Sequence, residues 1–274
     1  MEKQIEPRLK LICEYFDIKK YGKFVIPEYQ RAYSWGIEQC DQLWQDLERF
    51  TNSEGKDPYF FGTIIVDCST TEELNLIDGQ QRTTTFLLLL KALLFKLYDI
   101  LESFKITEET EQLHEALTQC RNKIFELLYL CDAFERVKMQ KDFDVVGVSI
   151  LTNNSVNEVY KKELLTIMEA KNFDEAEKNV EKIKYRQKDN KYTNFFRNFK
   201  FFREKLEPYR ESKLYNFSSS FLNKCQVIEI RSWQTEQAIM MFNSLNSTGL
   251  PLTDADIISA QLYSRATKMT QKTN

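Results

Sequence analysis

A strand-like apolar run, a polar turn and a longer apolar run follow one another between residues 74 and 90, and this order constrains the fold more than any other stretch of the chain. Residues 74–77 (Leu-Asn-Leu-Ile) alternate as a strand does, and residues 86–90 (Phe-Leu-Leu-Leu-Leu) are typical of a buried helix. The connection, residues 78–85 (Asp-Gly-Gln-Gln-Arg-Thr-Thr-Thr), holds an acid, a glycine, two amides, a cation and three hydroxyls. The chain is therefore predicted to pass from a strand through a tight polar turn into a buried helix.

The composition of this turn suits an anion. A helix N-terminus presents backbone N–H groups without intrahelical acceptors, together with the positive end of the helix dipole. Gly79 would let the backbone approach a ligand, and Arg82 offers a planar fork of donors to phosphate. We interpret the turn as a nucleotide phosphate site, in which Asp78 or a Thr hydroxyl holds Mg²⁺. The alternative is a capped helix start that Asp78 and Arg82 order by pairing, and the pattern alone favours neither.

A second segment, residues 26–35, interleaves aromatic side chains with an amide and a cation directly after a predicted strand. Such a set can stack on a flat ring and hydrogen-bond to its edge. This makes Gln30, Arg31 and Trp35 candidate ligand contacts. For the segment alone, a packed loop whose aromatic side chains cover the core is the favoured alternative.

A third segment, residues 242–253, places Asn243 and Asn246 three positions apart, on one face of a predicted helix. Their amides could read a base or brace the phosphate turn. A helix end followed by a new helix start explains Gly249 and Thr253, but does not require either asparagine.

Charge and composition limit the function classes. The formal net charge of −3, from 38 Lys and Arg against 41 Asp and Glu, excludes a general polyanion binder, so DNA contact would need a local patch. Residues 191–203 mix basic and aromatic residues, but the helical spacing of their phenylalanines favours an amphipathic core helix. The one histidine, His114, excludes zinc sites that need several imidazoles and His-Asn-His nuclease cores.

Six cysteines occur without a C-x-x-C pair, and the N-terminus shows no secretion signal, which indicates reduced thiols in a cytoplasmic protein. The longest apolar run, residues 86–90, is far too short to span a bilayer, so no membrane partner is expected.

The remaining pattern predicts an α+β fold, with a small mixed sheet early in the chain and a mainly helical body after it. Ser34 and Thr107 are the predicted N-caps of the second and fourth helices. Strands are expected at 23–26, 59–66, 74–77, 136–140 and 225–230, with 59–66 and 74–77 as antiparallel partners. Helices are expected at 7–16, 37–47, 83–101, 108–128, across 156–209, at 235–245 and from 253 onward.

Four motifs occur in a fixed order: Pro27-x-Tyr29-Gln30-Arg31-x-Tyr33-x-Trp35, Phe61-Gly62-x-Ile64, Ile77-Asp78-Gly79-Gln80-Gln81-Arg82-x-Thr84-Thr85, and Phe242-x-x-Leu245-Asn246-x-x-Gly249-x-x-Leu252. Together they resemble the N-terminal domain of GmrSD-type, modification-dependent restriction endonucleases with a DGQQR motif. This domain also occurs in phosphorothioate-sensing and other phage-defence proteins. The resemblance covers residues 26–262.

The resemblance implies a ParB/sulfiredoxin-like nucleotide-binding core over residues 1–105. It further implies a mainly helical region, 106–274, that returns a strand and the Phe-Asn-Ser-Leu-Asn-Ser-Thr-Gly segment to the core. Sulfiredoxin-like proteins carry a reactive Cys in the turn, where this chain has Gln80 and Gln81, so thiol chemistry is unsupported.

It also implies binding of a nucleoside triphosphate, GTP or another, and Mg²⁺-dependent hydrolysis coupled to the control of DNA cleavage. We assign the phosphate chemistry to Asp78, Gln81 and Arg82, with Asp78 as the metal ligand. The assigned nucleotide contacts are Gly79, Gln80, Arg82, Thr83, Thr84, Gln30, Arg31, Trp35, Asn243 and Asn246. The alternative function is a sensor of nucleotide or modified DNA, or an interaction subunit, that controls a partner nuclease without hydrolysis.

Members of this family often carry a C-terminal nuclease with a histidine-centred motif, whereas this chain ends at Asn274 with one histidine. We therefore expect no nuclease activity from this chain alone. DNA would be reached through a nuclease domain outside this sequence or through a separate nuclease subunit. The oligomeric state, the preferred base and the DNA modification stay open.

Overall fold

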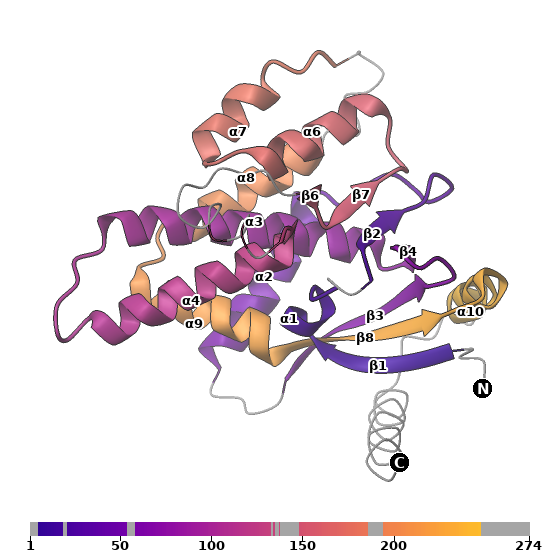
Figure 1. The fold of residues 1–274 in the computed structure, drawn as a ribbon, viewed down its shortest axis with the longest axis horizontal. Coiled ribbons are helices and arrows are strands. Elements are labelled where there is room, and N and C mark those ends of the chain that lie inside the picture. The colour runs from indigo at the N-terminus through magenta and orange to yellow at the C-terminus, as the bar shows by residue number, and fades with distance from the viewer. Residues whose placement is uncertain are drawn as a thin grey trace, which may run out of the picture.

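The computed structural model describes residues 5–18, 21–53, 58–132, 148–185 and 194–247, with 134 and 137 as isolated positions, and leaves the side chains of 243–247 undescribed. One sheet consists of β1 (Ile5–Leu11), β2 (Lys23–Ile26), β3 (Tyr59–Asp67), β4 (Glu73–Asp78), β7 (Leu151–Asn153) and β8 (Cys225–Ser232). These strands lie in the order β1-β8-β3-β4-β2-β7 (Figure 1). A two-stranded sheet pairs β5 (Tyr129–Leu130) with β6 (Val148–Ser149).

The main sheet is mixed, which confirms the predicted α+β class. β3 and β4 pair antiparallel, as predicted, with Val66 opposite Leu76. β2 runs parallel to β4, so the segments that follow these two strands begin at the same end of the sheet, where both strands have their C-termini. β8 comes from far along the sequence and lies between β1 and β3, antiparallel to β1 and parallel to β3. The polar turn after β4 and the loop after β2 therefore lie at the same end of the sheet.

Helices make up most of the rest: α1 (Ile12–Tyr15), α2 (Ile37–Asn52), α3 (Gln80–Ser103), α4 (Glu111–Leu128), α6 (Glu158–Glu169), α7 (Phe173–Val180), α8 (Asn194–Leu206), α9 (Glu211–Lys224) and α10 (Thr235–Ser247). Residues 83–97 of α3 are buried without interruption, and α4, α8 and α9 all contact this helix. A helix that is apolar all round is stable only inside a protein, which explains the central place of α3.

The two faces of the sheet are covered by different elements. Ile64 and Leu76 belong to the large core that the sheet shares with α3 and its neighbours. Ile65 and Ile77 point to the opposite face, where Ala238 of α10 packs on them. Figure 1 shows α10 beside the ends of β3 and β8, apart from the other helices.

The predicted helix over residues 7–16 is wrong for most of its length. Residues 5–11 form β1, in which Leu9 lies opposite Ile228, and only Ile12–Tyr15 is helical. Charged residues at 6, 8 and 10 alternate with apolar ones, which is the period of a strand. Pro7 fits because β1 is an edge strand of the sheet.

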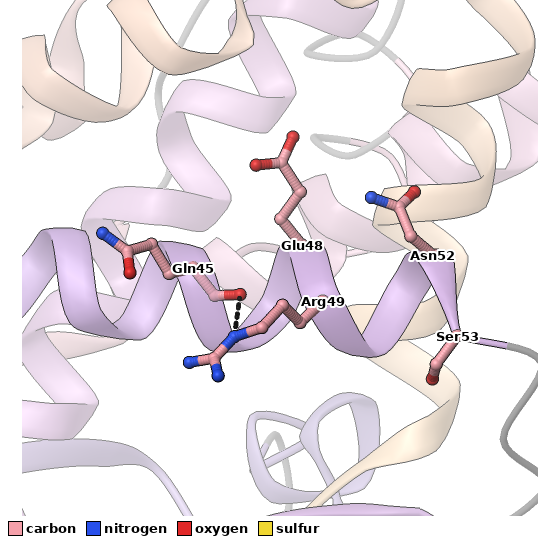
Figure 2. Close-up of a pocket in the computed structure, with 5 residues that line it drawn as sticks. All are labelled: Gln45, Glu48, Arg49, Asn52 and Ser53. Carbon is pink, nitrogen blue, oxygen red and sulfur yellow. Dashed lines mark hydrogen bonds between the residues drawn. The ribbon is translucent and has the colours of Figure 1, made fainter.

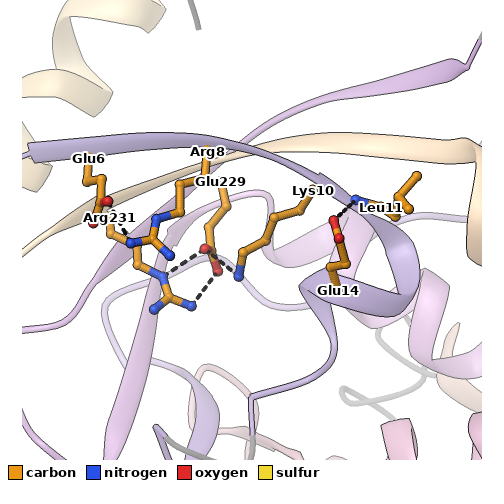
Figure 3. A network of polar contacts seen from close by, with 7 residues as sticks. All are labelled: Glu6, Arg8, Lys10, Leu11, Glu14, Glu229 and Arg231. Atoms are coloured by element: carbon orange, nitrogen blue, oxygen red, sulfur yellow. Dashed lines mark hydrogen bonds and ion pairs between the residues drawn. The ribbon is translucent and has the colours of Figure 1, made fainter. Parts of the chain in front are cut away.

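The charged side of β1 joins β8 in a buried network (Figure 3). The side chain of Glu229 is 0% exposed, and one of its oxygens lies 2.7 Å from Arg231 Nε and 2.7 Å from Lys10 Nζ. The Arg231 guanidinium lies 4.1 Å from the centre of the Tyr21 ring. Burial lowers the pKa of Lys10, and Glu229 opposes that shift. The network ties the edge strand to its neighbour.

Several element ends differ from the prediction. α3 begins at Gln80, three residues early. The N-cap of α2 is Gly36 and not Ser34, whose N–H and hydroxyl both donate to Gln81 Oε1. α4 begins after Thr110, because the Thr107 carbonyl accepts the N–H groups of a preceding turn. α6, α7 and α8 confirm helices within 156–209. The strand predicted at 136–140, apart from position 137, and the helix from 253 lie outside the described residues.

None of the helices in the described ranges combines the length and apolar character that a membrane crossing requires.

Candidate phosphate-binding turn at the start of α3

Gly79 makes the sharp connection from β4 to α3. Its φ is +83°, in the left-handed region, and it is the N-cap residue of α3. A Cβ at this position would lie 2.7 Å from Cγ1 of Ile64, which is closer than a real side chain tolerates. Both the backbone angle and the packing against β3 therefore require glycine.

The first turn of α3 has backbone donors without acceptors. Among the described residues, no acceptor meets the N–H groups of Gln80, Gln81 and Arg82, and no side chain caps the helix. The first intrahelical bond runs from the Thr83 N–H to the Gly79 carbonyl, at 2.9 Å. Three N–H groups and the positive end of a long helix dipole thus share one place, where an anion is favoured.

Arg82 lies next to these donors and is held at one nitrogen. Nη1 donates to the Phe61 carbonyl at 2.8 Å. The same nitrogen lies over Gly62, so close that a Cβ on Gly62 would be 2.1 Å from it. Nη2 is 3.8 Å from Asp78 Oδ2, which is beyond hydrogen-bond distance. The side chains of Arg82 and Asp78 are 25% and 36% exposed. The guanidinium is therefore positioned by β3 and still accessible to a ligand.

Gln81 points into the protein and holds the loop after β2. Its Oε1 accepts the backbone N–H groups of Ser34 at 2.8 Å and Trp35 at 3.2 Å, and its Nε2 donates to the Ala32 carbonyl at 3.1 Å. These three bonds give Gln81 a positioning role, whereas the catalytic role assigned to it from the sequence stays a prediction.

Gln80 and Gln30 make a second brace between the same two segments. Gln80 Nε2 donates to Gln30 Oε1 at 3.1 Å, and Gln30 Nε2 donates to the Ile77 carbonyl at 2.9 Å. The structure thus brings these two predicted contact residues together. Arg31, the next residue along the loop, has an exposed side chain, and Trp35 is half-buried against the core.

The threonine hydroxyls of the turn face the interior. Thr83 Oγ1 lies 2.7 Å from the Tyr15 hydroxyl and Thr85 Oγ1 lies 2.8 Å from the Tyr33 hydroxyl, and burial raises the pKa of both tyrosines. The buried Thr84 hydroxyl has no partner among the described residues. Thr83 and Thr84 are both 0% exposed, so their side chains lie beneath the surface of the turn.

The loop after β2 is packed against the core at one of its tyrosines and exposed at another. Tyr33 is 2% exposed and stacks on Phe195 of α8, with the ring centres 5.0 Å apart, as a packed loop requires. Tyr29 is 65% exposed and is therefore free of the core.

The two predicted asparagine contacts, Asn243 and Asn246, lie on α10, which contacts β4, but their side chains fall outside the description.

Two pockets formed by described residues lie elsewhere. One, of about 490 Å³, runs along the C-terminal half of α2 (Figure 2) and is lined by Gln45, Glu48, Arg49, Asn52 and Ser53. The other, of about 360 Å³, is lined by residues of α6 and α7 and of the segments that follow them. Neither contains a residue of the turn. No group of three potential metal ligands occurs within the described part of the chain.

The fold and the turn define a class: α+β proteins in which a Gly-x-x-Arg turn joins a mixed sheet to a buried central helix. Residues 12–263 match the family described as GmrSD restriction endonuclease, N-terminal domain, and the chain belongs to this family. This confirms the resemblance drawn from the four ordered motifs. Family membership places the protein in a restriction or phage-defence system. No individually curated protein matches the chain.

Proposed function

We propose that this domain binds a nucleoside triphosphate at the first turn of α3 and hydrolyses it with Mg²⁺, as the regulatory part of a DNA restriction system. One observation carries the proposal. Three backbone N–H groups without acceptors lie beside an arginine that β3 positions and solvent still reaches. Such donors stabilise phosphate oxygens through both hydrogen bonds and charge.

The residues of the turn fit a magnesium nucleotide. Asp78 is part-exposed and bound only loosely to Arg82, so its carboxylate is free to take a cation. Mg²⁺ in nucleotide sites keeps several waters and uses one or two carboxylates together with the phosphates, so a cage of protein ligands is not required. When bound, the ion would neutralise phosphate charge, while Arg82 and the helix N-terminus hold the phosphates in place.

The loop after β2 supplies further contacts in this proposal. Gln30 and Gln80 fix its position, Arg31 is exposed on it, and Trp35 is half-buried against the core. Asn243 and Asn246 are proposed contacts on α10. Occupancy of the site would shift the domain between two arrangements, and that shift would permit or block a partner nuclease, through which DNA is reached.

The engagement of Gln81 favours a second candidate function. Two backbone N–H groups occupy its amide oxygen, so Gln81 has no acceptor directed at an attacking water. A domain that binds nucleotide as a switch without hydrolysing it would have this arrangement. The partner nuclease would then respond to binding alone.

Calorimetric titration of GTP, ATP, CTP and UTP with Mg²⁺, followed by a phosphate-release assay, tests both. Heat of binding with phosphate release supports the hydrolase, and heat without release supports the switch. No heat with any of the four nucleotides would overturn the nucleotide site and leave the turn as a structural feature.

A further inference from the structure

Asn198 of α8 connects the helical body to the polar turn. Its side chain is 0% exposed. Nδ2 donates at 2.8 Å to the Tyr33 hydroxyl and at 2.8 Å to the Trp35 carbonyl. One buried amide therefore fixes two points of the loop after β2, although α8 is remote from that loop in sequence.

Both partners of Asn198 bond directly to the start of α3. The Tyr33 hydroxyl lies 2.8 Å from Thr85 Oγ1, and the Trp35 N–H donates to Gln81 Oε1. Two separate routes thus lead from α8 to the first turns of α3, each with a single residue between. The parallel stack of Tyr33 on Phe195 adds a third contact between α8 and the loop.

α8 is itself fixed in the helical body. Glu163 of α6 accepts the Phe196 N–H at 2.8 Å, near the start of α8, and α8 packs along α3. A displacement of α8 would therefore move the two hydrogen bonds of Asn198, and with them the loop that Gln81 holds. An anion site made of backbone N–H groups binds well only when those groups are held in one orientation beforehand.

We propose that Asn198 is a positioning residue for the turn. It orders the loop after β2 against Gln81 and Thr85, and so keeps the N–H groups of residues 80–82 and Arg82 in the arrangement that receives phosphate. Through it, the position of α8 sets the affinity of the turn. The ligand part of this inference rests on the proposed function, whereas the ordering of the turn does not.

Two variants and one control test it. Asn198→Leu removes both hydrogen bonds, and Tyr33→Phe, the milder change, removes only the hydroxyl between Thr85 and Asn198. Tyr129→Phe is the matched control. The Tyr129 hydroxyl is also buried and also joins two groups, Lys91 Nζ at 2.6 Å and the Met168 carbonyl at 2.6 Å, neither of them in the turn.

Affinity for inorganic tripolyphosphate with Mg²⁺ is measured by calorimetry, and amide exchange of residues 79–87 by mass spectrometry. We expect Asn198→Leu, which removes two hydrogen bonds, to weaken binding about tenfold. Tyr33→Phe, which removes one hydroxyl, should weaken it about threefold. Both should speed exchange of residues 79–87, while Tyr129→Phe leaves affinity within about twofold and that exchange unchanged.

Affinity losses no larger than in Tyr129→Phe, or unchanged exchange of residues 79–87 in both variants, would overturn the inference. If the wild-type chain binds neither tripolyphosphate nor any nucleotide, the proposed function fails. The exchange rates then still decide whether Asn198 orders the turn.

Discussion

Two groups of charged residues beside the main sheet use charge in opposite ways. The Glu229 cluster between β1 and β8 is buried, and one Glu229 oxygen lies 2.7 Å from both Lys10 Nζ and Arg231 Nε. In the turn, Arg82 and Asp78 are part-exposed and 3.8 Å apart, and Arg82 is held by a neutral carbonyl instead. Charges that neutralise each other in the interior fix strands together, whereas charges left loosely paired at a helix N-terminus stay available for a ligand.

The largest effect is expected where charge is buried. Glu229→Gln leaves Lys10 and Arg231 without their carboxylate in the interior, so the free energy of unfolding should fall by about 3–5 kcal/mol. Urea denaturation measures this. The control, Glu73→Gln, removes a surface pair with Lys23 at 3.5 Å and should cost less than about 1 kcal/mol. Equal losses in the two variants would show that the Glu229 cluster does not stabilise the sheet.

Arg82→Ala should separate binding from stability at the turn. We expect nucleotide binding to weaken by about 1.5–3 kcal/mol, the usual contribution of a charged hydrogen bond, with a much smaller change in melting temperature. Calorimetry and thermal denaturation measure the two quantities. Arg49→Ala, in the pocket on α2, is the control and should leave nucleotide affinity unchanged. A large melting loss with unchanged affinity would instead identify Arg82 as a brace for Asp78.

Gly62→Ala should disturb the turn without removing any of its charged groups. The φ of +97° strains any other residue, and the added Cβ would displace Nη1 of Arg82. We expect about 1 kcal/mol of lost stability and about tenfold weaker nucleotide binding. Gly36→Ala is the matched control, because its Cβ would meet only Gln39 Oε1 at an ordinary 3.6 Å. Unchanged affinity in Gly62→Ala would show that the position of Arg82 does not matter.

The smallest effect concerns Glu163, a buried carboxylate whose hydrogen bonds come from neutral donors, the Tyr185 hydroxyl and the Phe196 N–H. Burial raises the pKa of Glu163 above the usual 4.5 of a glutamate. Its stabilising contribution is therefore complete below pH 4.5 and is lost as pH rises through the folded-state pKa. Glu163→Gln removes this dependence, so the stability of the variant relative to wild type should increase from pH 4 to pH 7. Denaturation at both pH values checks the sign, and a decrease would contradict it.

The sequence predicts the turn well because its signals are local. A strand, a glycine and a polar helix start lie within a dozen residues, and the structure has all three in that order. The strand over residues 5–11 was missed, although charged and apolar residues alternate there, because its partner β8 lies at the far end of the chain. Pairing of distant segments leaves little trace in one sequence.

The direction in which the turn's side chains point was equally hidden. From the sequence, Gln81 is assigned to the phosphate chemistry, but in the structure its amide oxygen accepts the backbone N–H groups of Ser34 and Trp35. Asn198 was missed for a related reason. It lies within a segment correctly interpreted as a core helix, since Phe195 and Phe199 are buried, and a lone buried amide there gives no signal of its own.

The place of β8 in the sheet has a consequence for synthesis of the chain. Strands β1 and β3 leave the ribosome early, but the strand that belongs between them is made after the whole helical body. Until residue 232 emerges, β1 and β3 each lack the hydrogen-bonding partner that β8 provides, and Lys10 lacks its ion pair with Glu229. Closure over such a distance along the chain is slow, which makes this interval the time when a chaperone or an aggregating neighbour can bind the nascent protein.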